Sequence, residues 1–398
     1  TVRGPDHGAR GRGRSEAKAG GCQQGRSSEE GEGAFHEGNR RPRDSYSNRT
    51  PRRATVHPVV LGIDEPKVTA WLDANVESLT GPYTFDLIAG GRSNVTYRVS
   101  DAKGTKFVLR RPPLGHVLAT AHDMAREHRL ITAVGKTPVP VPRTLGLCTD
   151  VEVNGAPFYV MAYVEGTVLD SPEKASVMSL ENRRAASFDL IDVLADLHAA
   201  DVDEIGLGDL ARRDSYIERQ LKRWTTQWAN SKTREMPEMD VLVKKLQDHM
   251  PVQQGASIAH GDYRFGNCLT DTDAGKIVAV LDWELCTLGD PLADLGYIGI
   301  YWRDPGEPIT GGNDPTGIEG FPFYSELVER YAQKTGRDVS QIAYYRAFSA
   351  YRLAVIGEGV YARYLNGAMA DELPDMESMK NSVDTRVDWA LELLKNLR

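Results

Sequence analysis

IAHGDYRFGNCLTDTDAGKIVAVLDWELCTLGDPLAD, residues 258–294, is the stretch that decides the fold. Its first half contains a carboxylate and an amide, Asp262 and Asn267, and a short apolar run at 277–281 then leads to a second carboxylate, Asp282. The turn-forming residues between the two halves are typical of a β-hairpin, which would bring these side chains close together. Carboxylate and amide oxygens are the ligands that Mg²⁺ prefers. The stretch therefore predicts a magnesium site.

The spacing within this stretch indicates the chemistry. His260, Gly261 and Asp262, followed after four residues by Asn267, have the spacing of a kinase catalytic loop. In such a loop the Asp accepts the proton of the acceptor hydroxyl and the Asn binds a metal ion. A lone Asp is more often a cap of a helix or turn, but the whole set in this order favours a phosphotransferase. We predict ATP and Mg²⁺ as its cofactors, Asp262 as the base, and Asn267 and Asp282 as metal ligands.

The His-Gly-Asp order, where protein kinases have His-Arg-Asp, resembles the aminoglycoside phosphotransferase and choline kinase family over about residues 83–395. With Arg-Arg-Pro-Pro at 110–113, it looks most similar to the phosphotransferase domain of acyl-CoA dehydrogenase family members ten and eleven, and to free-standing bacterial relatives. The resemblance implies an α+β, two-lobed, kinase-like fold. Its N-lobe would be a five-stranded antiparallel sheet with a helix, and its C-lobe mainly helical. We also assign Arg264 to the catalytic group and consider an acyl-CoA dehydrogenase as a candidate partner.

Composition narrows the class of protein. The 398 residues are 40% hydrophobic, enough for two lobes or domains. No apolar run reaches the 18 or so residues that a membrane span requires. The four cysteines are far apart and form no C-x-x-C pair, which argues against a disulfide framework or a zinc site and fits a reducing cytoplasm.

The chain is divided by composition into a basic segment and an acidic body. Residues 1–56 carry 12 Lys and Arg against 7 Asp and Glu, a net charge of +5. Because the whole chain has a net charge of −8, the remaining residues have a net charge of −13. An acidic body argues against nucleic-acid binding. The segment has hardly a large apolar residue, and we predict a disordered basic tail; a nucleic-acid-binding tail is the alternative. We then expect an N-lobe at 57–165 and a C-lobe at 166–398, the latter with the catalytic loop, the metal site and a helical acceptor-binding insert.

The expected N-lobe shows the alternation of short strands separated by turn residues. A helical spacing of apolar residues at 68–78 predicts one helix on the back of the sheet. The strands are predicted at 83–88, 95–100, 106–111, 144–148 and 158–163, and a second helix at 120–134.

Two segments of this lobe are expected to hold the nucleotide. The glycine turn at 89–94 could cover the phosphates with main-chain N–H groups, although an ordinary hairpin turn is the alternative. The end of the last strand is the expected hinge, where main-chain groups and an apolar slot suit a purine. The residues assigned to the nucleotide in these segments are Gly90, Gly91, Ser93, Asn94, Met161, Tyr163 and Val164.

One arginine is expected to pair with the nucleotide phosphates. Arg110 falls where kinases place the lysine of the third strand, and the resemblance to choline kinases makes an arginine acceptable there. Arg111 is the competing choice. Glu127, in the following helix, would fix the direction of the cation, because an unpaired charge in a cleft is costly.

The acceptor is less constrained by the sequence. The insert at 211–235 carries seven basic residues against three acidic ones, with Tyr216, Trp224 and Trp228, and residues 344–364 add Arg346, Arg352 and Arg363. This pattern suits an anionic, partly apolar small-molecule hydroxyl acceptor such as a hydroxyacyl-CoA or a hydroxy acid. The alternative for the insert is a solvated helix with scattered charge. The alternative functions are an aminoglycoside or amino-alcohol kinase and a pseudokinase-like module, and the sequence does not predict the oligomeric state. The residues assigned to the acceptor are Arg219, Arg223, Trp224 and Glu284.

Overall fold

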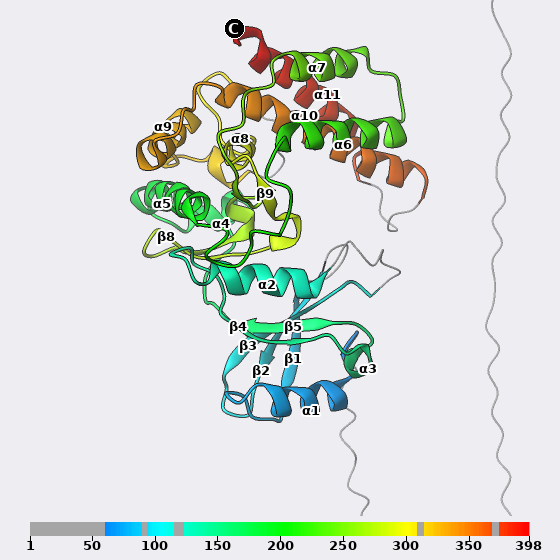
Figure 1. The fold of residues 1–398 in the computed structure, drawn as a ribbon, viewed down its shortest axis with the longest axis vertical. Coiled ribbons are helices and arrows are strands. Elements are labelled where there is room, and N and C mark those ends of the chain that lie inside the picture. The colour runs from blue at the N-terminus through cyan, green and yellow to red at the C-terminus, as the bar shows by residue number, and fades with distance from the viewer. Residues whose placement is uncertain (1–59, 90–93, 115–122, 309–313, 368–373, 398) are drawn as a thin grey trace, which may run out of the picture. The chain divides into compact units, whose positions relative to one another are not determined.

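The computed structural model describes residues 60–397 except 90–93, 115–122, 309–313 and 368–373 (Figure 1). The predicted tail at 1–56 lies outside the described residues. So do Gly90, Gly91 and Ser93 of the predicted phosphate turn.

The N-terminal part is an antiparallel sheet with the strand order β1-β2-β3-β5-β4 (Figure 1). Helix α1 (Glu65–Asn75) contacts the short helix α3 (Val151–Asn154). Helix α2 (Met124–Val134) packs against β4 and β5. The five strands and helix α2 confirm the predicted N-lobe. The strands are β1 (Thr84–Ala89), β2 (Val95–Ser100), β3 (Lys106–Arg111), β4 (Thr144–Cys148) and β5 (Phe158–Ala162).

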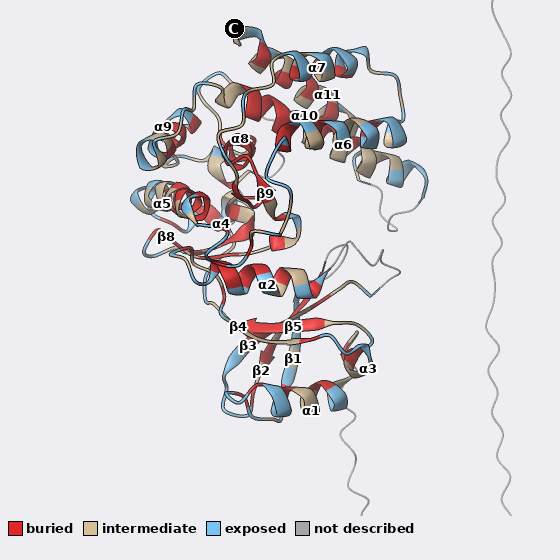
Figure 2. Ribbon diagram, viewed as in Figure 1, coloured by how far each residue is buried: buried red, intermediate tan, exposed pale blue. Residues whose placement is uncertain are grey.

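Both faces of this sheet are covered by apolar side chains. Phe107 and Leu109 belong to a core cluster with residues of α1, whereas Val108 belongs to the larger cluster that continues through α2 into the helices beyond. Successive side chains of a strand point to opposite faces, so β3 contributes to both cores. Figure 2 shows the resulting buried interior of the sheet.

The C-terminal part is mainly helical, as predicted. The long helix α10 packs against α6, α8 and α11, and α5 packs against α9. Figure 2 shows α8 and the N-terminal half of α10 as buried. The helices are α4 (Pro172–Ser176), α5 (Leu180–Ala199), α6 (Tyr216–Ser231), α7 (Pro237–Asp248), α8 (Leu292–Ile298), α9 (Tyr324–Thr335), α10 (Ile342–Leu365) and α11 (Met376–Leu393), with four 3-10 turns: η1 (Phe265–Asn267), η2 (Trp283–Leu285), η3 (Pro315–Gly317) and η4 (Leu394–Asn396).

Two small antiparallel pairs lie at the base of the helical part. Strand β6 (Ser257–Ala259) pairs with β9 (Thr287–Gly289), and β7 (Cys268–Asp271) pairs with β8 (Lys276–Val280). The chain leaving the N-terminal sheet joins the second pair, because Thr167 and Thr270 exchange main-chain hydrogen bonds of 2.8 and 2.9 Å. No helix among the described residues is long and apolar enough to cross a membrane.

Candidate active site

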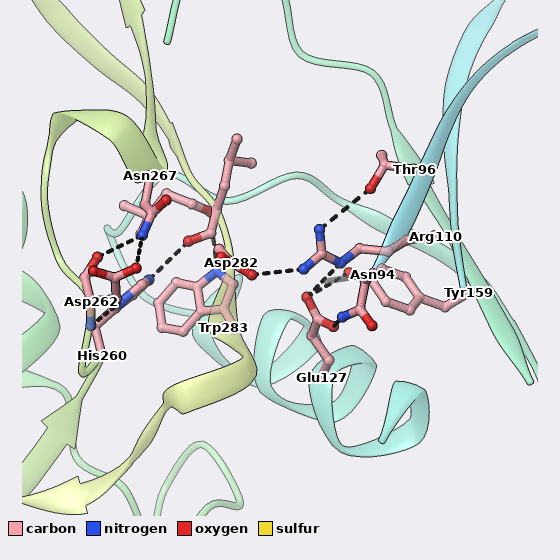
Figure 3. Close-up of polar contacts among 12 residues, drawn as sticks. Asn94, Thr96, Arg110, Glu127, Tyr159, His260, Asp262, Asn267, Asp282 and Trp283 are labelled. Atoms are coloured by element: carbon pink, nitrogen blue, oxygen red, sulfur yellow. Dashed lines mark hydrogen bonds and ion pairs between the residues drawn. The ribbon is translucent and has the colours of Figure 1, made fainter. Parts of the chain in front are cut away.

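The predicted catalytic loop forms between β6 and β7 and brings Asp262 and Asn267 together (Figure 3). The amide nitrogen of Asn267 donates to Asp262 Oδ2 at 2.7 Å and to its main-chain oxygen at 2.8 Å. Both donor contacts of the amide are therefore on Asp262, and the carbonyl Oδ1 is the atom suited to a cation. Leu281 N donates to Asn267 O at 2.8 Å, which places Asp282, the next residue, beside Asn267.

A buried carboxylate supports this loop from helix α8. Asp294 accepts hydrogen bonds from His260 N at 2.7 Å and Gly261 N at 2.8 Å, and His198 Nε2 lies 3.3 Å from the same carboxylate. Burial acts to raise the pKa of Asp294, but the hydrogen bond and charge of His198 hold it below its ordinary value. An ionised Asp294 can accept both main-chain bonds, so it fixes the backbone directly before Asp262.

Glycine is required at the middle position of His-Gly-Asp. Gly261 has φ +84°, and a Cβ there would lie 3.0 Å from Leu285 O. The left-handed conformation and the close approach of η2 both disfavour any side chain. The ring of His260 then accepts from Asp262 N at 3.3 Å and contacts Leu281 O at 2.9 Å through Nε2, which joins the loop to the end of β8.

Arg110 connects the sheet with both acidic groups expected near the phosphates (Figure 3). Its Nε lies 3.1 Å from Glu127 Oε1, and its Nη2 lies 2.7 Å from Asp282 Oδ1. Burial acts to lower the pKa of Arg110, but the charges of Glu127 and Asp282 hold it above its ordinary value. The guanidinium therefore stays charged, and its two ion pairs set its orientation.

Glu127 in turn is held by two neighbours besides Arg110. Tyr159 Oη donates to its Oε1 at 3.1 Å, and Asn94 Nδ2 donates to its Oε2 at 3.2 Å. Thr96, opposite Arg110 in β2, accepts from Arg110 Nη1 at 3.4 Å. Burial raises the pKa of Glu127, and Arg110 opposes that rise. The side chain of Asn94, a residue of the predicted phosphate turn, thus supports the carboxylate of Glu127.

Strand alternation places Arg110, and not Arg111, at this site. Arg110 follows Val108 on the face toward α2, whereas Arg111 points to the other face and donates to the main-chain oxygens of Gly62 and Asn154. Arg111 therefore fastens the segments around α1 and α3.

An apolar cavity of about 270 Å³ opens between the sheet and the β7–β8 pair. The three predicted hinge residues line it, and Arg110, Glu127 and Asp282 stand at one side. Asp282 adopts a left-handed conformation with φ +61°, one that Asp tolerates better than most residues. The lining residues from the predicted site are Arg110, Glu127, Met161, Tyr163, Val164 and Asp282.

A polar cavity of about 440 Å³ lies next to the apolar one, and Glu127 lines both. Two of the predicted acceptor residues, Arg223 and Glu284, line the polar cavity together with Arg126. Burial, reinforced by the negative charge of Asp282, raises the pKa of Glu284 to about 7. The cavity is thus bordered by two arginines, Arg126 and Arg223, and by three carboxyl groups, those of Asp123, Glu127 and Glu284.

The Phosphotransferase enzyme family matches residues 84–337. The chain belongs to this family. Acyl-CoA dehydrogenase family member 10 of Mus musculus is 37% identical to this chain over 295 residues, which are 72% of this chain and 27% of that protein. Family member 11 of Gallus gallus is 33% identical over 78% of this chain and 40% of its own length. The chain thus spans less than half the length of these curated relatives.

A solved structure supports the same conclusion about the fold. A protein from Ralstonia eutropha JMP134, provisionally assigned as an aminoglycoside phosphotransferase, superimposes with a TM-score of 0.73 and 32% identity. The match covers 84% of this chain and 99% of that one. The chain therefore has the kinase-like fold that the sequence predicted.

The remaining predicted acceptor residues of the chain have different contacts. Trp224 stacks between two cations, with Arg223 Cζ 5.4 Å and Arg352 Cζ 5.5 Å from its ring centroid. Arg219 donates to Arg212 O at 2.9 Å and lines neither of the two cavities. Arg346, also considered for the acceptor, is a buried partner of Glu307 at 2.7 Å and has a structural role.

Several residues around the site carried no distinguishing sequence signal. Thr96 and Tyr159 face Arg110 from the neighbouring strands, and the strand register that brings them there is set by the whole sheet.

Arg264, predicted to be catalytic, lies with Nε 3.4 Å from Asp262 Oδ1. The described residues include no group of three or more His, Cys, Asp or Glu that could hold a metal ion.

Proposed function

We propose that this chain is an ATP-dependent small-molecule kinase that transfers the γ-phosphate to a hydroxyl group. The observation that carries the proposal is one continuous constellation: Asn267 bonded to Asp262, Asp282 beside Asn267, and Arg110 joining Asp282 to Glu127. It stands at the side of an apolar cavity suited to a purine. The family match supports the phosphotransferase class.

The nucleotide would bind with its base in the apolar cavity and its phosphates toward Arg110. Met161 would line the slot, and the main chain of Tyr163 and Val164 would bond the base. Because Glu127 and Asp282 already orient the guanidinium, little rotamer freedom would be lost when it engages phosphate oxygens.

The donor set fits a magnesium ion that is shared with phosphates. Asn267 directly precedes β7 and Asp282 follows β8, so the two offer an amide oxygen and a carboxylate at the same end of the β7–β8 pair. Mg²⁺ usually takes one or two protein ligands and completes its shell with phosphate oxygens and water, so a full protein cage is unnecessary. When bound, the ion would neutralise phosphate charge.

Asp262 would act as the general base. Asn267 holds one carboxylate oxygen, and Arg264 lies 3.4 Å from the other, Oδ1, so this oxygen is the one that would face the acceptor. The acceptor oxygen bonds to the γ-phosphorus as its bond to the ADP oxygen breaks, and the hydroxyl proton passes to Asp262. Positioning and charge stabilisation provide most of the catalysis in such a transfer.

The acceptor we propose is anionic and partly apolar, a hydroxyacyl-CoA or a hydroxy acid. Arg223 borders the polar cavity, and Trp224 beside it offers an aromatic surface. The names of the relatives further suggest an acyl-CoA dehydrogenase as a partner.

An acceptor screen tests this function. The chain, Mg²⁺ and ATP are incubated with a hydroxyacyl-CoA, a hydroxy acid, kanamycin and choline, and phosphate adducts are detected by mass spectrometry. We expect an adduct on an anionic acceptor that disappears in Asp262→Asn and persists in Asp273→Asn, an exposed aspartate of the adjoining hairpin. Adducts that persist in Asp262→Asn would refute the assigned base, and adducts on kanamycin alone would refute the acceptor class.

A further inference from the structure

Arginines from three separate elements meet two tyrosines beside Asp262. Arg264 directly precedes η1, Arg352 lies in α10, and Arg386 lies in α11. Arg264 Cζ is 5.3 Å from the ring centroid of Tyr301, and Arg352 Cζ is 5.1 Å from that of Tyr297. The tyrosine hydroxyls are 3.2 Å apart. Arg264 and Arg386 are 122 residues apart in the sequence, so only the fold assembles these groups.

The charge of Arg386, in α11, acts on the same pair of tyrosines. Burial raises the pKa of Tyr301, the positive charges of Arg264 and Arg386 oppose the rise, and Asp262 adds to it. Burial also lowers the pKa of Arg386 itself. A Cβ on Gly357 of α10 would lie 3.4 Å from Arg386 Nη1, so the guanidinium is seated against α10. All three arginines therefore belong to one cluster with Asp262.

This cluster has an excess of positive charge. Asp262 is the one carboxylate in the described part of the chain that forms an ion pair with any of the three arginines, through Arg264. Within the same residues, neither Arg352 nor Arg386 has an ion pair or hydrogen bond, and the Nε of each is buried. A partly buried cation without a counter-charge is costly, and so is a buried donor without an acceptor.

The aromatic contacts account for only part of this arrangement. A guanidinium over a tyrosine or tryptophan face gains a modest cation–π energy, but the ring faces leave the planar N–H groups without acceptors. The missing partner has to be an anion with several oxygens, which an arginine can bind through two parallel hydrogen bonds. Such an anion would lie close to the catalytic base.

We propose that Arg264, Arg352 and Arg386 form a subsite for an anionic oxygen group of the acceptor, a carboxylate or a phosphate, next to Asp262. This inference rests on the proposed function and adds the group by which the acceptor is recognised. Arg352 also stacks on Trp224, which adjoins Arg223 of the polar cavity. The aromatic surface thus continues from the subsite toward that cavity and would contact an acyl chain.

Equilibrium binding to the full chain tests the subsite. Calorimetry with Mg²⁺ and a non-hydrolysable ATP analogue would compare 3-hydroxyoctanoate, its CoA thioester and the neutral 3-hydroxyoctanamide. Arg352→Met and Arg386→Met should each weaken anion binding roughly tenfold to a hundredfold, the loss of one charge-assisted hydrogen bond. Arg386→Lys should recover part of it, and the amide should bind equally to all variants. The matched control is Arg363→Met, because Arg363 is an exposed arginine of α10, the helix that contains Arg352.

The outcomes distinguish a carboxylate from the CoA phosphates as the bound anion. They also distinguish failure of the subsite from failure of the proposed kinase function. An effect confined to the free acid identifies a carboxylate, and one confined to the thioester identifies the CoA phosphates. The subsite is overturned if neither anion binds the wild type, if the amide binds as tightly as the anions, or if Arg386→Lys and both methionine variants bind anions normally. Loss of the nucleotide analogue by the wild type would instead overturn the proposed kinase function.

Discussion

The two sides of the site differ in how their charges are balanced. On the nucleotide side, Arg110 pairs with Glu127 and Asp282, and Asn267 bonds to Asp262. On the acceptor side, Arg352 contacts the ring of Tyr297 and has no carboxylate partner in the described part of the chain. Paired charges are rigid before any ligand arrives, whereas unpaired ones indicate what a ligand must bring. The nucleotide half is therefore preorganised, and the acceptor half is completed by its substrate.

The largest expected effect concerns the base that both halves share. Asp262→Asn should reduce turnover by about 10²–10⁴-fold, the range of general-base catalysis, because the amide cannot accept the acceptor proton. Steady-state kinetics on the full chain measures this, with Asp273→Asn as the control. A loss below tenfold would show that Asp262 is not the general base, and the nucleotide and acceptor sides would then share no catalytic group.

The next effect separates the two arginines of β3. Arg110→Met should raise the KM for ATP roughly tenfold to a hundredfold, and Arg110→Lys should recover only part, because lysine lacks the planar fork. Arg111→Met should lower the melting temperature and leave that KM unchanged, since its bonds go to main-chain oxygens near α1. If Arg111→Met raised the KM for ATP more than Arg110→Met did, the ion pairs of Arg110 would have no role in nucleotide binding.

A smaller effect is expected on the acceptor side. Arg223→Glu should raise the KM for an anionic acceptor roughly threefold to tenfold, and added salt should reduce the difference. Arg219→Glu is the matched control from the same helix, because that arginine bonds Arg212 O and lines neither cavity. Equal effects of both reversals would show that overall charge, and not the cavity, attracts the acceptor.

The smallest effect is a pH dependence from Glu284. Its pKa is raised from the ordinary 4.5 to about 7 by burial and by Asp282, with Arg110 opposing and with Glu127 and Asp262 adding to the rise. Between these values the folded chain binds more protons than the unfolded one, so this contribution to stability is complete below 4.5, falls as pH rises toward about 7, and is absent above.

The same titration should reach the acceptor. Ionisation of Glu284 above about pH 7 adds negative charge to the polar cavity, so the KM for an anionic acceptor should rise a few-fold across that pH. Glu284→Gln should flatten both the KM profile and this part of the stability profile. A profile that Glu284→Gln leaves unchanged would assign the dependence to another group.

Most of the sheet and the catalytic loop could be predicted from the sequence because their signals are local. Strands β2, β3 and β4 have the predicted bounds, and one loop contains both Asp262 and Asn267. The choice between Arg110 and Arg111 could not be made, because apolar residues cover both faces of β3 and the pattern therefore gives no side preference.

The acceptor side depends on contacts between helices far apart in the chain, and its prediction was less complete. Arg386 was not among the predicted acceptor residues, since the sequence of helix α11 alone does not show that α10 packs against it. Arg346 was assigned to the wrong environment because its partner Glu307 lies 39 residues away. Pairing between distant charges is decided by packing, which local patterns do not contain.

The most direct measurement of the central claim is calorimetric titration of Mg²⁺ and a non-hydrolysable ATP analogue into Asp262→Asn and Asp282→Ala. If Asp262 is the base and Asp282 the metal ligand, the first variant should bind the nucleotide with nearly wild-type affinity, and the second should lose most of that binding. Equal loss of affinity in both variants would contradict the division of roles on which this account depends.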